Sequence, residues 1–330
     1  MTSSRREQVN LEATPYYHCM TRCVRRSFLC GVDSYSKQDY SHRKTWMLAR
    51  LKKLASIFSI KVCAYALMSN HYHLVLRVDE GPASDWSNEE VVRRWSLIYP
   101  RDAKLNANKK LKVIEWRRRL YDISWFMRCL NEPFARAANK EDNCKGRFWE
   151  SRFKSQALLD EGAVLSAMVY VDLNPIRAGI VDTPEESDFT SIFERIKNFK
   201  HQQKTKKNSS EKQTIDNVKQ VEHLLALNSN NHNVVDANIH IPLLDYFDLV
   251  DYTGRVIRAD KSGAIPSHLE PILSRLDFDN AGWLSIVQNI GTRFSHAIGS
   301  EFHLSHFSQM QNRKRMMKGI KAAKQSYLVA

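Results

Sequence analysis

Two neighbouring segments with different side-chain patterns constrain the fold of this chain more than any other feature. Residues 61–68 (KVCAYALM) are apolar on both faces, whereas residues 71–79 (HYHLVLRVD) alternate between polar and apolar positions. An apolar run is typical of a central strand, and alternation is typical of a strand with one buried face. The turn-forming pair Ser69-Asn70 separates them. The sequence therefore predicts two β-strands that follow one another across a turn.

The segments around this pair have the order of a split β-α-β arrangement. We predict a strand over residues 15–23 and a helix over 38–60, where apolar residues recur at three- and four-residue steps. A helix over 119–140, a strand over 152–159 and a helix over 161–173 follow the pair. This order is that of a ferredoxin-like α+β fold. We therefore expect an antiparallel sheet with helices on one side.

Composition divides the chain into three parts. Residues 1–199 hold the predicted strands and helices and form the main domain, with an insertion at about 81–117 where the pattern weakens. Residues 200–240 are rich in Lys, Gln, Ser and Asn, which predicts a polar linker with a short helix near 221–227. Residues 241–330 regain apolar periodicity, so we predict a small, mainly helical extension that ends in a basic tail.

The charge of the chain points to a polyanionic partner. Lys and Arg number 50 against 36 Asp and Glu, a formal net charge of +14. Residues 101–154 alone hold fifteen basic and seven acidic residues, and aromatic side chains beside cations suit unpaired bases. For any one of these aromatic residues, a place in the core is the better interpretation; for the whole stretch we favour nucleic acid. The aromatic residues are Trp116, Trp125, Phe126, Phe148, Trp149 and Phe153.

Other partners and compartments are less compatible with the sequence. The chain lacks an apolar run of the length that a bilayer requires, and residues 1–10 do not resemble a secretory signal. We therefore expect a cytoplasmic protein with neither a membrane partner nor a small-molecule substrate. The six cysteines are scattered without a repeated C-x-x-C pair, which favours reduced, mostly buried thiols over a zinc site.

His71 and His73 are the first candidate site residues. Two residues apart on a strand, they share one face, whereas Tyr72 and Leu74 face the other way. Neutral imidazoles at this spacing could hold one divalent metal ion. The alternative is a chance pair of histidines on an exposed strand.

Tyr170 and Asn174 are the second pair. Four residues apart on a helix, they lie on one face, away from the apolar stripe. A tyrosine of the core would lie inside that stripe. Asn174 could equally be a helix cap, because Pro175 disfavours helical geometry at the residue before it.

Three strings resemble the REP-associated tyrosine transposases, relatives of the single-tyrosine HUH transposases of small insertion sequences. They are YALMSNHYHLVLR, GRFWESRFKSQ and YVDLNPIRAGIV, and they occur in the order of the family's motifs, after an N-terminal YHCMTR strand. The resemblance covers residues 15–181. The insertion at about 81–117 and the chain beyond residue 199 depart from the compact form of the family.

The resemblance implies an HUH endonuclease fold and roles for particular residues. His71, His73 and Asn174 would bind a divalent metal, Mg²⁺ or Mn²⁺, and Tyr170 would be the nucleophile. The implied reaction is cleavage and strand transfer of single-stranded or hairpin DNA through a covalent 5′-phosphotyrosine. We expect basic and aromatic side chains of the motifs to bind DNA, although surface solubility explains some of them almost as well: Arg22, Arg147, Trp149, Arg152, Lys154 and Arg177.

Two other functions stay open at this point. The chain could be a domesticated, catalytically inactive protein that binds hairpin DNA or RNA, which the charge and the aromatic content fit equally well. It could also be a sequence-specific regulator that acts through the extension, a weaker interpretation. The family includes monomers and dimers, so a homodimer is possible.

Overall fold

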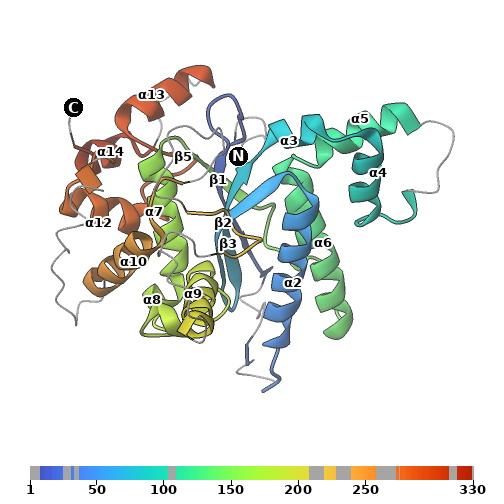
Figure 1. Ribbon diagram of the computed structural model, residues 1–330, viewed down its shortest axis with the longest axis horizontal. Helices are drawn as coiled ribbons and strands as arrows, with labels where there is room; N and C mark the ends of the chain where they lie inside the picture. Colours follow the sequence, from blue (N-terminus) through green and yellow to red (C-terminus); the bar gives the residue numbers. More distant parts are fainter. Residues whose placement is uncertain are drawn as a thin grey trace.

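A central β-sheet with helices on both of its faces dominates the computed structural model (Figure 1). The structure describes most of the chain, and the statements below concern that part only. The described residues are 8–24, 31–32, 37–102, 109–207, 219–227, 239–257, 273–274, 276–311 and 318–328.

The sheet has five strands in the order β2-β3-β1-β4-β5. The first four strands in this order form three antiparallel pairs, and β5 pairs parallel with β4. The predicted antiparallel sheet is confirmed, and the predicted strand pair is β2 and β3. The short β5 comes from the C-terminal extension and was not predicted. The strands are β1 (Tyr16–Arg22), β2 (Ile60–Leu67), β3 (His71–Val78), β4 (Lys154–Leu158) and β5 (Ala297–Ile298).

Helices cover both faces of this sheet. Helices α2 (His42–Ile57) and α6 (Ile123–Glu141) pack together on one face, where the hydroxyl of Tyr72 on β3 donates to Asn131 on α6 at 2.5 Å. Helix α7 (Glu161–Asp172) covers the other face and contacts β2 and β3. The expectation of helices on one side is therefore wrong for α7. The reason is that both faces of β3 carry side chains that are buried.

The sequence dictates where α7 begins and ends. The Asp160 side chain caps it by accepting from the backbone N–H of Ala163 at 2.7 Å. Nearly all its side chains are buried, because the sheet covers one side and the C-terminal helices cover the other. It ends at Asp172, and Pro175 lies in the first turn of the short helix α8 (Asn174–Arg177).

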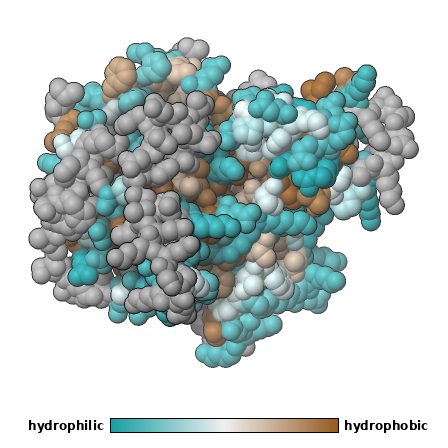
Figure 2. Space-filling view, viewed as in Figure 1, coloured by the Kyte–Doolittle hydropathy of each residue, from teal (hydrophilic) through white to brown (hydrophobic). Residues whose placement is uncertain are grey.

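The insertion is a helical unit and its aromatic residues belong to the core. It contains α3 (Glu80–Asp85), α4 (Asn88–Ser96) and α5 (Lys109–Arg119). Trp95 and Trp116 stack at 5.9 Å between ring centroids, and both are buried. The face seen in Figure 2 is mostly hydrophilic, but α5 exposes the apolar side chains of Leu111 and Ile114.

The predicted linker contains regular structure in its described residues. Helix α9 (Ser191–Lys207) extends past residue 200, where the linker was expected to begin. The short helix near residues 221–227 is wrong, because Leu224 pairs with Val62 and the backbone N–H of Leu225 donates to the carbonyl of Val62 at 2.7 Å. Strand β2 is an edge of the sheet, so its outer backbone groups are available to pair with this segment, which lies extended along it. Residues 208–218 and 228–238 lie outside the described part.

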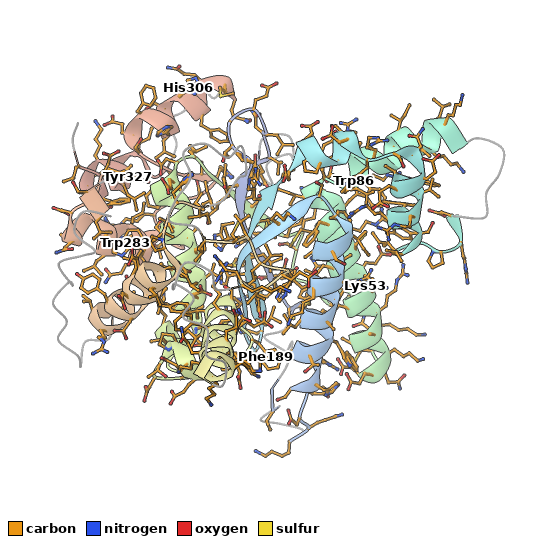
Figure 3. All side chains as sticks on the ribbon, in the orientation of Figure 1. Lys53, Trp86, Phe189, Trp283, His306 and Tyr327 are labelled. Atoms are coloured by element: carbon orange, nitrogen blue, oxygen red, sulfur yellow. The ribbon has the colours of Figure 1, made fainter. Side chains whose placement is uncertain are left out.

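The extension packs on α7. Its helices α10 and α12 both contact α7. The hydroxyl of Tyr246 donates to the buried carboxyl of Asp172 at 2.6 Å. Figure 3 shows Trp283 and Tyr327 among these helices, and both pack against Phe278. The helices are α10 (Leu243–Ile257), α12 (Asn280–Asn289), α13 (Glu301–Met310) and α14 (Ile320–Ser326); residues 312–317 of the predicted basic tail lie outside the described part.

Two smaller expectations concern thiols and membranes. Cys19, Cys23, Cys63 and Cys129 are buried and Cys144 is exposed, and none of these described cysteines forms a disulfide; Cys30 is outside the described residues. None of the described helices combines the length and the apolar character needed to cross a membrane.

Candidate active site

His71, His73 and Tyr170 meet where α7 lies across β3. The two imidazoles share one face of the strand, as predicted, with 5.0 Å between ring centroids. The phenol ring of Tyr170 stands edge-on to His73 at 5.7 Å. His73 is only 2% exposed, whereas His71 and Tyr170 are half-buried. The structure therefore brings together three of the four residues that the sequence predicted for the metal site and the nucleophile.

His18 is a fourth member of this cluster, and sequence analysis missed it. It lies on β1, which pairs with β3, and its side chain points to the same face of the sheet. Its Nε2 atom is 2.9 Å from Nδ1 of His73, and its ring lies 5.9 Å from that of Tyr170. The alternation of His18 with Met20 and Arg22 along the YYHCMTR strand was the available signal.

Burial keeps these imidazoles neutral. It lowers the pKa of His18 to about 4, and it lowers the pKa of His73 well below its usual value. The pKa of His71 is lowered to about 4 by burial first and then by the nearby charge of Arg22. Neutral imidazole is the form that binds a metal ion. The cluster is therefore in the required protonation state at neutral pH.

The hydrogen bond at Nδ1 of each imidazole determines that Nε2 is the nitrogen left to bind a ligand. Nδ1 of His71 lies 2.6 Å from the side-chain oxygen of Asn70, and Nδ1 of His73 lies 2.9 Å from His18. Among the described residues, neither Nε2 of His71 nor Nε2 of His73 has a hydrogen-bond partner. These two atoms are the available ligands, and a partner on the other ring nitrogen is the usual arrangement in metal sites.

Asn174 is the remaining predicted ligand. Its side-chain N–H donates to the backbone carbonyl of Tyr170 at 3.3 Å, which directs the amide and leaves its oxygen for another partner. No cluster of three or more His, Cys, Asp or Glu side chains in the described part of the chain could hold a metal ion. The donor set of two imidazole nitrogens and one amide oxygen nevertheless fits a divalent ion whose remaining ligands come from phosphate or water.

The Tyr170 hydroxyl faces the C-terminal extension. A Cβ atom built on Gly291 would lie 2.9 Å from the phenol oxygen, so the backbone of that loop approaches closely because the residue is glycine. The guanidinium of Arg177 lies 4.8 Å from the centre of the Tyr170 ring. Gly291 lies more than a hundred residues beyond the tyrosine, and the sequence carried no signal for this contact.

The predicted DNA-binding residues fall into two groups. Arg22 lies opposite His71, and Lys154 lies opposite Met20, so both belong to the histidine face, and both are exposed. Arg177, exposed on α8, joins them through its contact with Tyr170. These three cations surround the candidate site.

The second group lies on the opposite side of the sheet. Arg147, Trp149 and Arg152 precede β4, which begins at Lys154 and not at the predicted residue 152. The Trp149 indole N–H donates to the carbonyl of Asn131 at 3.1 Å, and its ring packs against Tyr72. Trp149 and Arg152 line a cavity of about 690 Å³ beside α6. Arg147 is exposed.

Comparisons with known proteins add one distant match. No family model matches the chain, and no curated protein matches it. A solved structure of a REP-associated tyrosine transposase bound to a REP hairpin aligns with a TM-score of 0.38 and 15% sequence identity, over 60% of this chain and 86% of that one.

Proposed function

We propose that this protein cleaves and rejoins single-stranded DNA at hairpin-forming repeats, with Tyr170 as the nucleophile. The observation that carries the proposal is the packing of the Tyr170 ring against His73 and His18, 5.7 and 5.9 Å away, in a cluster of neutral imidazoles. A tyrosine that only fills the core has no need of such neighbours. The proposal includes the ferredoxin-like HUH arrangement of residues 1–199 that the sequence motifs resemble.

The covalent step exchanges one phosphoester bond for another. The phenol oxygen of Tyr170 attacks the scissile phosphorus, the new O–P bond forms, and the bond from phosphorus to the 3′ oxygen breaks. The net proton moves from the phenol to the departing 3′ oxygen. The product is a 5′-phosphotyrosine and a free 3′-hydroxyl, and attack by a 3′-hydroxyl on this linkage rejoins a strand without ATP.

His71, His73 and Asn174 are the proposed holders of a divalent ion, Mg²⁺ or Mn²⁺. When bound, such an ion polarises the phosphate and offsets the charge that develops in the transition state. The two imidazoles contribute Nε2 atoms whose orientation is fixed from the Nδ1 side. Asn174 contributes an amide oxygen from the first residue of α8, one turn after the nucleophile.

The cations around the site hold the backbone of the substrate. Arg22 and Lys154 on the sheet and Arg177 on α8 are exposed, and each offers a charge-assisted hydrogen bond to a phosphate oxygen. Arg147, Trp149 and Arg152 offer a second contact surface on the other side of the sheet, where the cavity that Trp149 and Arg152 line beside α6 suits an unpaired base.

The test is a denaturing-gel assay with labelled hairpin oligonucleotides, with Mn²⁺ or EDTA, using wild type and Tyr170→Phe. A metal-dependent protein–DNA band that resists SDS and disappears in the variant is the expected result. The control is Tyr99→Phe, a tyrosine of the insertion, which should form the band as wild type does. A band that survives in Tyr170→Phe would overturn the proposed nucleophile.

A second candidate function is hairpin DNA or RNA binding without cleavage. One observation favours it: Gly291 lies against the Tyr170 hydroxyl, so the extension covers the proposed nucleophile. The same assay separates the two functions. Tight hairpin binding without any covalent band, over a broad panel of repeats, would favour the binding protein.

A further inference from the structure

A chain of hydrogen bonds leads from the C-terminal extension to His73. The side-chain N–H groups of Gln156 donate to the backbone carbonyls of Ile290 and Phe294, at 3.3 and 3.0 Å. The side-chain oxygen of Gln156 lies 2.8 Å from Nδ1 of His18. Nε2 of His18 lies 2.9 Å from Nδ1 of His73. Four segments that are far apart in sequence thus share one continuous path.

The carbonyls at one end fix the position of every proton along this path. A backbone carbonyl can only accept, so the nitrogen of Gln156 must face Ile290 and Phe294. The oxygen of Gln156 then faces His18 and accepts, which places a proton on Nδ1 of that imidazole. In neutral His18 the other nitrogen, Nε2, must accept the hydrogen bond, so Nδ1 of His73 donates it. His73 is left with its lone pair on Nε2.

The geometry of β1 and β4 makes this path possible. His18 lies directly opposite Gln156 in the register of the two strands, so their side chains leave the sheet side by side on the histidine face. His18 is 5% exposed and His73 is 2% exposed, so water cannot readily substitute for a missing partner. An imidazole that lost its partner here would either rotate or change tautomer.

The segment that holds Gln156 also touches the proposed nucleophile. Ile290 and Phe294 flank Gly291, whose backbone faces the Tyr170 hydroxyl. Residues 297–298 of the same segment form β5, which pairs with β4 directly beside Gln156. The extension therefore contacts the site at two points, the tyrosine and the histidine path.

We propose that Gln156 and His18 are positioning residues through which the C-terminal extension fixes His73 as its Nδ1–H tautomer and so sets the affinity for a divalent ion. The inference rests on the proposed function in so far as it takes His73 as a metal ligand. Neither residue touches the ion or the substrate. Each acts through the lone pair that it leaves on Nε2 of His73.

The test measures tautomers and metal affinity on the full chain without DNA. ¹⁵N-histidine NMR reports which ring nitrogen carries the proton, and Mn²⁺ titration followed by EPR gives the dissociation constant. In wild type, His18 and His73 should both be Nδ1–H tautomers. Gln156→Leu should mix the tautomers of both rings and weaken Mn²⁺ binding about 10- to 100-fold, the range typical of outer partners of metal ligands.

Two further variants separate positioning from folding. Gln156→Glu keeps an oxygen that accepts from His18 but loses the N–H groups that donate to Ile290 and Phe294, so it should retain the Nδ1–H tautomers and more of the Mn²⁺ affinity than Gln156→Leu, without full recovery. His306→Gln changes an exposed histidine of α13 and should alter neither quantity. Circular dichroism and thermal unfolding verify that Gln156→Leu is folded.

The outcomes are distinct from those of the cleavage assay. Wild-type tautomers and affinity in Gln156→Leu would overturn the inference, as would a wild-type protein that does not bind Mn²⁺. If affinity depends on Gln156 but no covalent DNA adduct forms, the cleavage proposal fails and the positioning role stands.

Discussion

Successive side chains of strand β3 point to opposite faces of the sheet, and the two faces have opposite roles. Towards α2 and α6, Tyr72, Leu74 and Leu76 are fully buried and form part of the hydrophobic core. Towards α7, His71 and His73 occupy the alternate positions and meet Tyr170. One face buries apolar area, which stabilises the fold, while the other buries polar groups, which costs free energy unless they are paired. The core face therefore fixes the strand on which the two histidines lie.

The largest expected effect comes from the core face. Leu74→Ala should lower the free energy of unfolding by about 3 kcal/mol, because a fully buried leucine leaves a cavity in a packed sheet. Urea unfolding measures this. The matched control is Leu111→Ala on α5, where the side chain is 77% exposed and the change should stay within about 0.5 kcal/mol. A similar loss in both variants would break the contrast between a core face and an exposed one.

The histidine face should respond in the opposite way. His71→Ala should weaken Mn²⁺ binding by at least about 100-fold, which is more than the loss of an outer partner causes. The free energy of unfolding should change little, because burying the polar imidazole of half-buried His71 costs free energy that offsets its contacts. Isothermal titration calorimetry and urea unfolding measure the two quantities. His306→Ala serves as the control. If His71→Ala destabilised the protein without affecting Mn²⁺, this face would be structural.

Acid should destabilise the protein through the buried imidazoles of the histidine face and not through the core face. The pKa of His18 is about 4 when folded and 6.5 in the unfolded reference, so the unfolded chain binds the proton first. Its stabilising contribution is present above pH 6.5 and is lost as pH falls towards 4. Between pH 7 and 4.5 this loss is about 2 kcal/mol. Urea unfolding at both values should show that His18→Gln loses about that much less than wild type; equal losses would contradict the assignment.

The smallest effect concerns the cavity beside α6, on the side of the sheet away from the histidines. Arg152→Gln should weaken hairpin binding by about 1 kcal/mol whatever the sequence, and should lower the slope of log affinity against log salt by about 1, because one phosphate contact is lost. Fluorescence anisotropy over a salt series measures both. Arg93→Gln, at an exposed position of α4, should change neither. An unchanged slope in Arg152→Gln would remove this residue from the DNA surface.

The local elements of this protein follow from its sequence. Alternation over residues 71–79 predicted β3 and the shared face of His71 and His73, and the helical spacing of Tyr170 and Asn174 placed them one turn apart. The order of elements predicted the antiparallel sheet. These features depend on periodicity and on capping residues such as Asp160 and Pro175, which act within a few residues of the chain.

Only the tertiary structure decided what those elements meet. Which face α7 covers, the pairing of Leu224 with edge strand β2, and β5 beside β4 all depend on contacts between distant segments. The same holds for Gly291 against Tyr170 and for the path from Ile290 through Gln156 and His18 to His73. Periodicity states that a face is polar or apolar, but not which partner covers it, because that choice is made by the packing of the whole chain.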